Sequence, residues 1–233
     1  MRKSSIVVNL LKTTILVIMI GGIGRLSINE NSPPRLKQVQ ERVINDINAR
    51  LTGHYDIQPL VMAGGDPYIR ALMRTISASE AYTQRPYHVI YGGQYVQKLD
   101  RHPDQCVVVK RGANAGKCST AAGRYQFLNT TWAEKASIYH PQADFIGDNN
   151  SYSFEAQYQD EVLYRWLSDG EAWGVDFSQM LAQNQLDQVL RRLSNTWTSL
   201  GYGTEDNSMT RRLPKIYQQM LQEELANQQA SKN

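Results

Sequence analysis

One glutamate, Glu80, stands in a sequence context that favours acid–base chemistry. Apolar residues recur at the spacing of one helical face within residues 66–80, at positions Ile69, Leu72, Met73 and Ile76. Glu80 is the next member of that series, so its carboxylate continues the stripe that faces the core. It also falls near the helix C-terminus, where the macrodipole disfavours negative charge. Burial and this dipole both raise the pKa of a carboxyl group, and a raised pKa suits a general acid near neutral pH. The alternative is a solvated glutamate without a function.

The elements around Glu80 follow from local signals. Asp66 is expected to cap the helix, and Pro67 suits its first turn. Residues 87–91 favour a strand, and residues 106–110 and 117–119 are expected to form an antiparallel hairpin across a turn-rich segment. Further helices are expected at residues 131–139, 153–168, 177–183, 186–199 and 209–226. A helical body with one small sheet predicts an α+β fold.

The N-terminal residues 1–29 have the features of a targeting segment. Arg2 and Lys3 precede an apolar stretch at residues 13–24, which has the length of a signal-peptide core and is short for a membrane span. We therefore expect a cleaved signal peptide or an uncleaved N-terminal membrane anchor. In both cases the rest of the chain is exported to the periplasm or the extracellular space, and an uncleaved segment would tether it to the inner membrane.

Composition and spacing suggest three further units. Residues 30–65 are expected to be a tether with an amphipathic helix at residues 35–51, residues 66–226 the main domain, and residues 227–233 a disordered tail. The 233-residue chain is 41% hydrophobic and has a net charge of +3, so most of it can build a core. This mild charge does not predict nucleic-acid binding, which usually shows clustered Lys and Arg residues; the pairs Arg191-Arg192 and Arg211-Arg212 are interpreted as solvated helix faces or ends.

The two cysteines, Cys106 and Cys118, flank the predicted hairpin turn. In an exported protein we expect them to form a disulfide. Their spacing does not match a zinc site, and the scattered histidines form no ligand motif, so no metal or cofactor is expected.

Several short blocks in the main domain resemble those of one enzyme family. They are Ser79-Glu80, Tyr87 to Gly93, His102-Pro103, Ala122 to Gln126, Ser194 to Leu200, and Gly201-Tyr202-Gly203. In this order and spacing they are similar to the lambda-type phage endolysins, which are lambda lysozyme-like peptidoglycan lytic transglycosylases. The resemblance extends from about residue 66 to about residue 217. The chain differs from the family directly after Glu80, where it has Ala81 in place of glycine.

The resemblance implies a lysozyme-like, two-lobed fold with a central cleft for peptidoglycan glycan strands. We expect the protein to be a monomer. Glu80 matches the sole catalytic acid of the family, which cleaves the β-1,4 bond between N-acetylmuramic acid and N-acetylglucosamine and leaves a 1,6-anhydro end. By position in the family blocks, Gln126 and Tyr125 are expected to bind substrate in the cleft, as are Tyr91 and Tyr202.

Two other functions compete with this interpretation. A hydrolytic muramidase needs a second carboxylate, which Asp100 or Asp104 could supply. An anchored cell-wall-binding module without catalysis would need no acid at all. The position of Glu80 on the apolar stripe favours an enzyme over the binding module.

Overall fold

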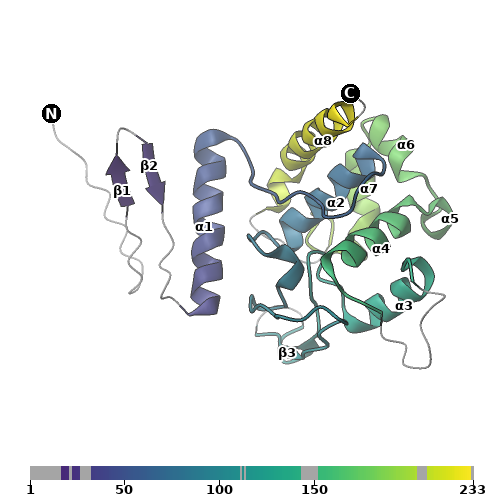
Figure 1. The fold of residues 1–233 in the computed structure, drawn as a ribbon, viewed down its shortest axis with the longest axis horizontal. Helices are drawn as coiled ribbons and strands as arrows, with labels where there is room; N and C mark the ends of the chain where they lie inside the picture. Colours follow the sequence, from purple (N-terminus) through teal and green to yellow (C-terminus); the bar gives the residue numbers. More distant parts are fainter. Residues whose placement is uncertain are drawn as a thin grey trace.

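A computed structural model describes residues 17–20, 23–26, 33–110, 112, 114–142, 152–203 and 209–231. Figure 1 shows a helical body with one helix and a hairpin beside it. The strands are β1 (Val17–Ile20), β2 (Ile23–Leu26), β3 (Val107–Val108) and β4 (Cys118–Ser119). The α-helices are α1 (Pro34–Thr52), α2 (Pro67–Glu80), α3 (Asn129–Tyr139), α4 (Ala156–Ser168), α5 (Gly170–Trp173), α6 (Phe177–Ala182), α7 (Leu186–Leu193) and α8 (Leu213–Ala230). Two short 3₁₀ helices are η1 (Pro86–His88) and η3 (Thr210–Arg212).

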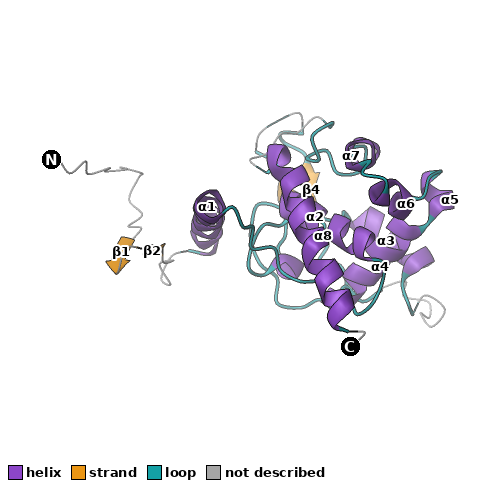
Figure 2. Cartoon of the chain, turned by 90° about the horizontal axis from the view of Figure 1, so that it is seen from above, coloured by secondary structure: helices purple, strands orange, loops and turns teal. Residues whose placement is uncertain are grey.

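Helix α2 is the central element of the body. It begins as the sequence predicts, because an Asp66 carboxylate oxygen accepts a hydrogen bond from the backbone N–H of Ile69 at 3.0 Å. Its apolar stripe is buried, and Leu72, Met73 and Ile76 are fully shielded from solvent. The helix packs against α8 along much of its length, as Figure 2 shows, and also against α4 and α6. Glu80 is therefore the last residue of a rigid, buried helix.

Buried ion pairs fasten α2 to α8. The Arg74 guanidinium lies 3.1 Å from the carboxylate of Glu224 and 2.6 Å from that of Glu223. One turn earlier, Arg70 lies 2.6 Å from Glu224. The attraction within a buried ion pair is largely offset by the cost of removing both charges from water, so such a pair adds little net stability. Breaking it is nevertheless costly, because the remaining charge is then buried without a partner. The ion pairs therefore hold α2 in a single register against α8.

The predicted disulfide hairpin is confirmed. Strand β3 pairs antiparallel with β4, with Val107 opposite Ser119 and Val108 opposite Cys118. The Cys106–Cys118 disulfide joins positions whose Cα atoms are 5.3 Å apart. The two cysteines are thus diagonal neighbours across the hairpin. This sheet and the surrounding helices also confirm the α+β class.

The strand predicted at residues 87–91 does not form. Pro86 to His88 adopt a 3₁₀ turn instead, and only Val89 and Ile90 make isolated bridges, to Tyr95 and Ala122 respectively. Proline fixes its own φ and supplies no N–H donor, so it favours a helical first turn over a strand. The β-prone residues that follow are therefore too few for a full strand.

The body extends beyond both predicted ends. Tyr55, Ile57, Leu60 and Met62 belong to the hydrophobic core, so the segment expected to be a tether joins the body before residue 65. At the other end, α8 continues to Ala230, so residues 227–230 are helical and not a disordered tail. Both differences come from packing partners that are distant in the sequence.

The described part of the N-terminal segment is an antiparallel hairpin. Strands β1 and β2 pair with Val17 opposite Leu26, while residues 1–16, 21–22 and 27–32 lie outside the described residues. No helix in the described part of the chain is long and apolar enough to cross a membrane. The signal peptide or membrane anchor therefore stays a prediction.

Helix α1 occupies the region in which the sequence predicts an amphipathic helix, and it contacts the body near the end of α2. Its residues Gln40, Ile44 and Ala49 are buried. The Glu41 carboxylate accepts hydrogen bonds from the hydroxyls of Thr83, at 3.0 Å, and Tyr95, at 3.1 Å. Because Thr83 lies in the loop that directly follows Glu80, the helix attaches to the body close to the candidate acid.

Candidate active site

Glu80 ends α2 in a half-buried position, where a second segment of the chain contacts its carboxylate. The Ser199 hydroxyl donates a hydrogen bond to Oε1 of Glu80. The neighbouring Ser79 hydroxyl in turn donates to Ser199 Oγ at 2.7 Å. A carboxyl group held in this way has a defined direction, which a proton donor to substrate needs.

Ser199 is a site residue that sequence reasoning did not assign. Its hydroxyl reaches Glu80 across 119 residues of chain, a contact that no local pattern reveals. The only hint in the sequence is that Ser199 lies in the block from Ser194 to Leu200, which carries part of the family resemblance. That block does not indicate which of its residues contacts the acid. The structure thus adds a hydroxyl partner to the predicted acid.

Gln126 lies in the loop before α3 and has a left-handed backbone, with φ of 49°. Its side-chain N–H₂ group donates to the backbone carbonyls of Gly123, at 2.9 Å, and Val89, at 3.3 Å. Within the part of the chain that the structure describes, no donor reaches its Oε1. The residue is half-buried. Its amide oxygen is therefore a fixed acceptor, suited to an N–H group of a ligand such as an N-acetyl amide.

The structure corrects the role predicted for Tyr125. Its side chain is fully buried, and its hydroxyl donates to the Asp160 carboxylate at 2.6 Å. Burial raises the pKa of Tyr125 well above its ordinary value, so the phenol stays protonated. A ring without an exposed face cannot stack on a sugar, so Tyr125 is a core residue that supports the loop carrying Gln126.

Tyr91 lies beside the same loop. Its backbone N–H donates to the carbonyl of Ala121 at 2.8 Å, and its side chain is partly exposed. The preceding residue, Ile90, bridges to Ala122. The structure therefore brings Tyr91 close to the loop that carries Gln126.

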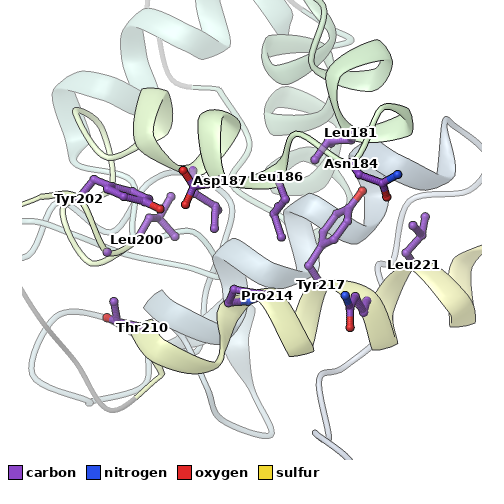
Figure 3. Close-up of a pocket in the computed structure, with 13 residues that line it drawn as sticks. Leu181, Asn184, Leu186, Asp187, Leu200, Tyr202, Thr210, Pro214, Tyr217 and Leu221 are labelled. Atoms are coloured by element: carbon purple, nitrogen blue, oxygen red, sulfur yellow. The ribbon is translucent and has the colours of Figure 1, made fainter.

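Tyr202 lines a pocket together with Leu200. Its ring is 40% exposed, and the guanidinium of Arg191 lies 4.3 Å from the ring centroid. The pocket, of about 440 Å³, lies among α6, α7 and α8. Figure 3 shows Tyr202 beside Leu200 at one end of it. Glu80, Gln126 and Tyr91 do not line this pocket, so only Tyr202 of the predicted site residues belongs to it.

Comparison with known proteins gives a family. The sequence model of the endolysin family matches residues 70–223, about two-thirds of the chain. The chain belongs to the endolysin family. It is therefore a lysozyme-like enzyme that degrades the bacterial cell wall, in agreement with the resemblance seen in the sequence. No curated protein sequence matches the chain.

Two solved structures of a phage enzyme are similar to this endolysin-family chain. Lysozyme from bacteriophage lambda has 22% sequence identity and a TM-score of 0.49, covering 70% of this chain and 97% of its own. Bacteriophage lambda lysozyme complexed with a chitohexasaccharide has 23% identity and a TM-score of 0.48, covering 68% of this chain and 97% of its own.

The two aspartates considered as a second carboxylate are both exposed in this endolysin-family chain. Asp104 has φ of 47°, and its Oδ1 accepts a hydrogen bond from the side chain of Asn129 at 2.6 Å. Asp100 follows the buried Leu99 and is itself exposed to solvent. Among the described residues, no group of three His, Cys, Asp or Glu side chains is placed to hold a metal ion.

Proposed function

We propose that this endolysin-family chain is a peptidoglycan lytic transglycosylase, with Glu80 as its single catalytic acid and base. The substrate is the glycan strand, cleaved at the β-1,4 bond between N-acetylmuramic acid and N-acetylglucosamine. The observation that carries the proposal is the half-buried Glu80 at the end of α2, oriented by a hydroxyl donor. Gln126 is proposed to bind an N-acetyl group through its amide oxygen, with Tyr91 and Tyr202 as further sugar contacts.

The proposed reaction needs one carboxyl group in two protonation states. Protonated Glu80 gives its proton to the glycosidic oxygen as the bond from that oxygen to C1 breaks. The resulting carboxylate then takes the proton of the muramoyl 6-hydroxyl as O6 bonds to C1. The products are a 1,6-anhydro end and a free sugar hydroxyl, and Glu80 is protonated again. Because the substrate supplies its own nucleophile, no second carboxylate is required, unlike in most glycosidases.

Substitution of Glu80 tests the catalytic role. Glu80→Gln removes the titrating group with little change of volume, so the protein is expected to fold and bind cell-wall polymer. Loss of a general acid typically lowers the rate by ~10²–10⁴-fold. We expect clearing of a purified peptidoglycan suspension to fall by that factor. Activity above about a tenth of the wild-type rate would exclude general acid catalysis by Glu80, and an inactive wild-type protein that still binds the polymer would favour the wall-binding module.

Product analysis separates the transglycosylase from the hydrolytic muramidase. Anhydro ends are lighter by one water than the reducing ends made by hydrolysis, so mass spectrometry of the fragments distinguishes them. Digestion in heavy-oxygen water gives a second readout, since only hydrolysis transfers solvent oxygen to the cut end. We expect anhydro ends without the label. Asp100→Asn and Asp104→Asn should each leave activity within a few-fold, whereas a large loss in a folded variant would favour the two-carboxylate hydrolase.

A further inference from the structure

The Ser199 hydroxyl contacts the proposed acid but has no role in the reaction described above. It belongs to a chain of two donors, in which Ser79 donates to Ser199 Oγ at 2.7 Å and Ser199 donates to Oε1 of Glu80. With the Ser79 proton directed at its oxygen, the Ser199 proton points to the carboxylate. Consecutive hydrogen bonds of this kind strengthen one another in a partly buried site. The arrangement therefore favours one orientation of the carboxyl group.

The backbone around Ser199 leaves this hydroxyl little freedom. Trp197 is buried, and its indole N–H donates to the backbone carbonyl of Tyr125 at 2.9 Å. Leu200 is 1% exposed and packs in the core. The carbonyl of Ser199 itself accepts a hydrogen bond from the Thr210 hydroxyl at 2.9 Å. Core contacts on both sides thus fix Ser199 in front of Glu80.

The same contacts connect the acid to the loop of Gln126. Tyr125, which accepts the indole N–H of Trp197, directly precedes Gln126 in the chain. The segment that positions the Glu80 carboxyl and the loop that presents the Gln126 amide therefore share one rigid junction. A fixed distance between the proton donor and an amide acceptor is what a site for a sugar polymer needs.

We propose that Ser199 is a positioning residue for the reaction: its hydroxyl binds Oε1 of Glu80 and directs the acidic proton, on Oε2, toward the glycosidic oxygen. This inference rests on the proposed function of Glu80. A protonated carboxyl group accepts a hydrogen bond best at its carbonyl oxygen, so the bond from Ser199 to Oε1 favours the proton on Oε2. Ser199 gives up no proton itself and forms no bond to substrate, so it acts through Glu80 alone.

The test compares Ser199→Ala with a matched control, Ser194→Ala. Ser194 is also buried on the same stretch, but its hydroxyl donates to the backbone carbonyl of Leu190 at 2.8 Å. Glu80 becomes a carboxylate as it gives up its proton, and loss of a hydrogen bond to such a charged group lowers the rate by about tenfold to a hundredfold. We expect Ser199→Ala to lower kcat by that factor with KM little changed, and Ser194→Ala to leave kcat within about twofold.

Two further variants show whether the hydroxyl itself is responsible. Ser199→Thr keeps the hydroxyl and should restore kcat, whereas Ser199→Cys keeps the volume with a much weaker donor and should not. Adding Ser199→Ala to Glu80→Gln should cause no further loss, because a residue that acts through Glu80 has nothing left to position. Thermal unfolding of each variant is measured beside kcat. If Ser199→Ala alone folds poorly, the comparison of Ser199→Thr with Ser199→Cys still tests the inference.

The outcomes separate this inference from the proposed function. If Glu80→Gln is inactive while Ser199→Ala keeps kcat within about twofold at an unchanged Tm, the positioning role is wrong and the acid role stands. If Ser199→Cys is as active as Ser199→Thr, the hydroxyl is not required, and the inference fails. If Glu80→Gln remains active, the proposed function itself fails.

Discussion

Two buried histidines, His102 and His140, share one hydrogen-bonding arrangement. Each accepts a backbone N–H at Nδ1, from Asp104 and from Gln142 respectively, both at 3.1 Å. Each Nε2 then lies within reach of a backbone carbonyl, at Phe127 for His102 and at Ser153 for His140. Because Nδ1 is an acceptor, the proton is on Nε2, and the neutral ring satisfies both partners. Protonation would place a second N–H against a backbone N–H.

This arrangement predicts a stability that decreases in mild acid. Burial lowers the pKa of both His102 and His140 below the ordinary value of 6.5, despite the raising effect of their carbonyl partners. A group whose pKa is lower in the folded state contributes stability that is complete above its unfolded pKa and is lost as the pH falls below it. We expect the free energy of unfolding to decrease between about pH 7 and pH 5.

Single variants test the source of that decrease. His102→Gln and His140→Gln each remove one titrating ring, so the slope of stability against pH should become shallower in each, whatever the absolute stability. Urea unfolding at several pH values measures this slope. His54→Gln, at an exposed position, is the control and should keep the wild-type slope. Equal slopes in all variants would show that other groups cause the pH dependence.

At the residue scale, the sequence predicts the environment of a side chain where that environment follows from the periodicity of neighbouring residues. Glu80 could be placed at the end of a buried helix because its stripe is read from neighbouring positions. Tyr125 could not, since the family block located it near the cleft but only its contact with Asp160 shows that the ring is core. Ser199 was missed for the same reason, because its partner lies in a distant helix.

At the scale of elements, the disulfide hairpin is attached to the loop that carries Gln126. Strand β4 ends at Ser119, and the Thr120 hydroxyl accepts from the backbone N–H of Asn129 at 3.1 Å. The backbone between them makes the bridge from Ala122 to Phe127. The loop of Gln126 is thus closed at its base by contacts that begin where the hairpin ends.

Reduction of the disulfide is expected to lower both stability and activity. The bond closes a loop with a sequence separation of 12, for which the chain-entropy model gives roughly 3 kcal/mol. A looser hairpin should also weaken the base of the Gln126 loop. Thermal unfolding and peptidoglycan clearing, with and without reductant, measure the two effects. Cys106→Ser with Cys118→Ser is the matched control for reductant, and unchanged activity after reduction would limit the bond to a structural role.

At the scale of the whole molecule, residues 55–62 are part of the helical body although they precede its predicted start. Asp160 is fully buried, and its carboxylate accepts the backbone N–H groups of Val61, at 2.7 Å, and Met62, at 3.2 Å. The buried Arg124 guanidinium donates to the carbonyl of Pro59 at 2.8 Å. The sequence boundary was drawn at glycines, a local signal, whereas these partners come from α4 and the loop before α3.

Two truncated chains test where the body begins. A chain that starts at residue 54 keeps every partner of Asp160 and Arg124 just described, while one that starts at residue 66 removes them. Asp160 keeps the Tyr125 hydroxyl as a donor in the shorter chain, but both buried charges lose backbone partners, and hydrogen bonds to charged groups contribute about 1.5–3 kcal/mol each. The apolar contacts of Ile57 and Leu60 are lost as well. We therefore expect the shorter chain to unfold at a much lower temperature or to be insoluble, and the longer one to stay folded and active on purified peptidoglycan. Thermal unfolding of the two chains decides the question, because they differ only by residues 54–65. Similar Tm values would show that the body begins after residue 65, as predicted from the sequence.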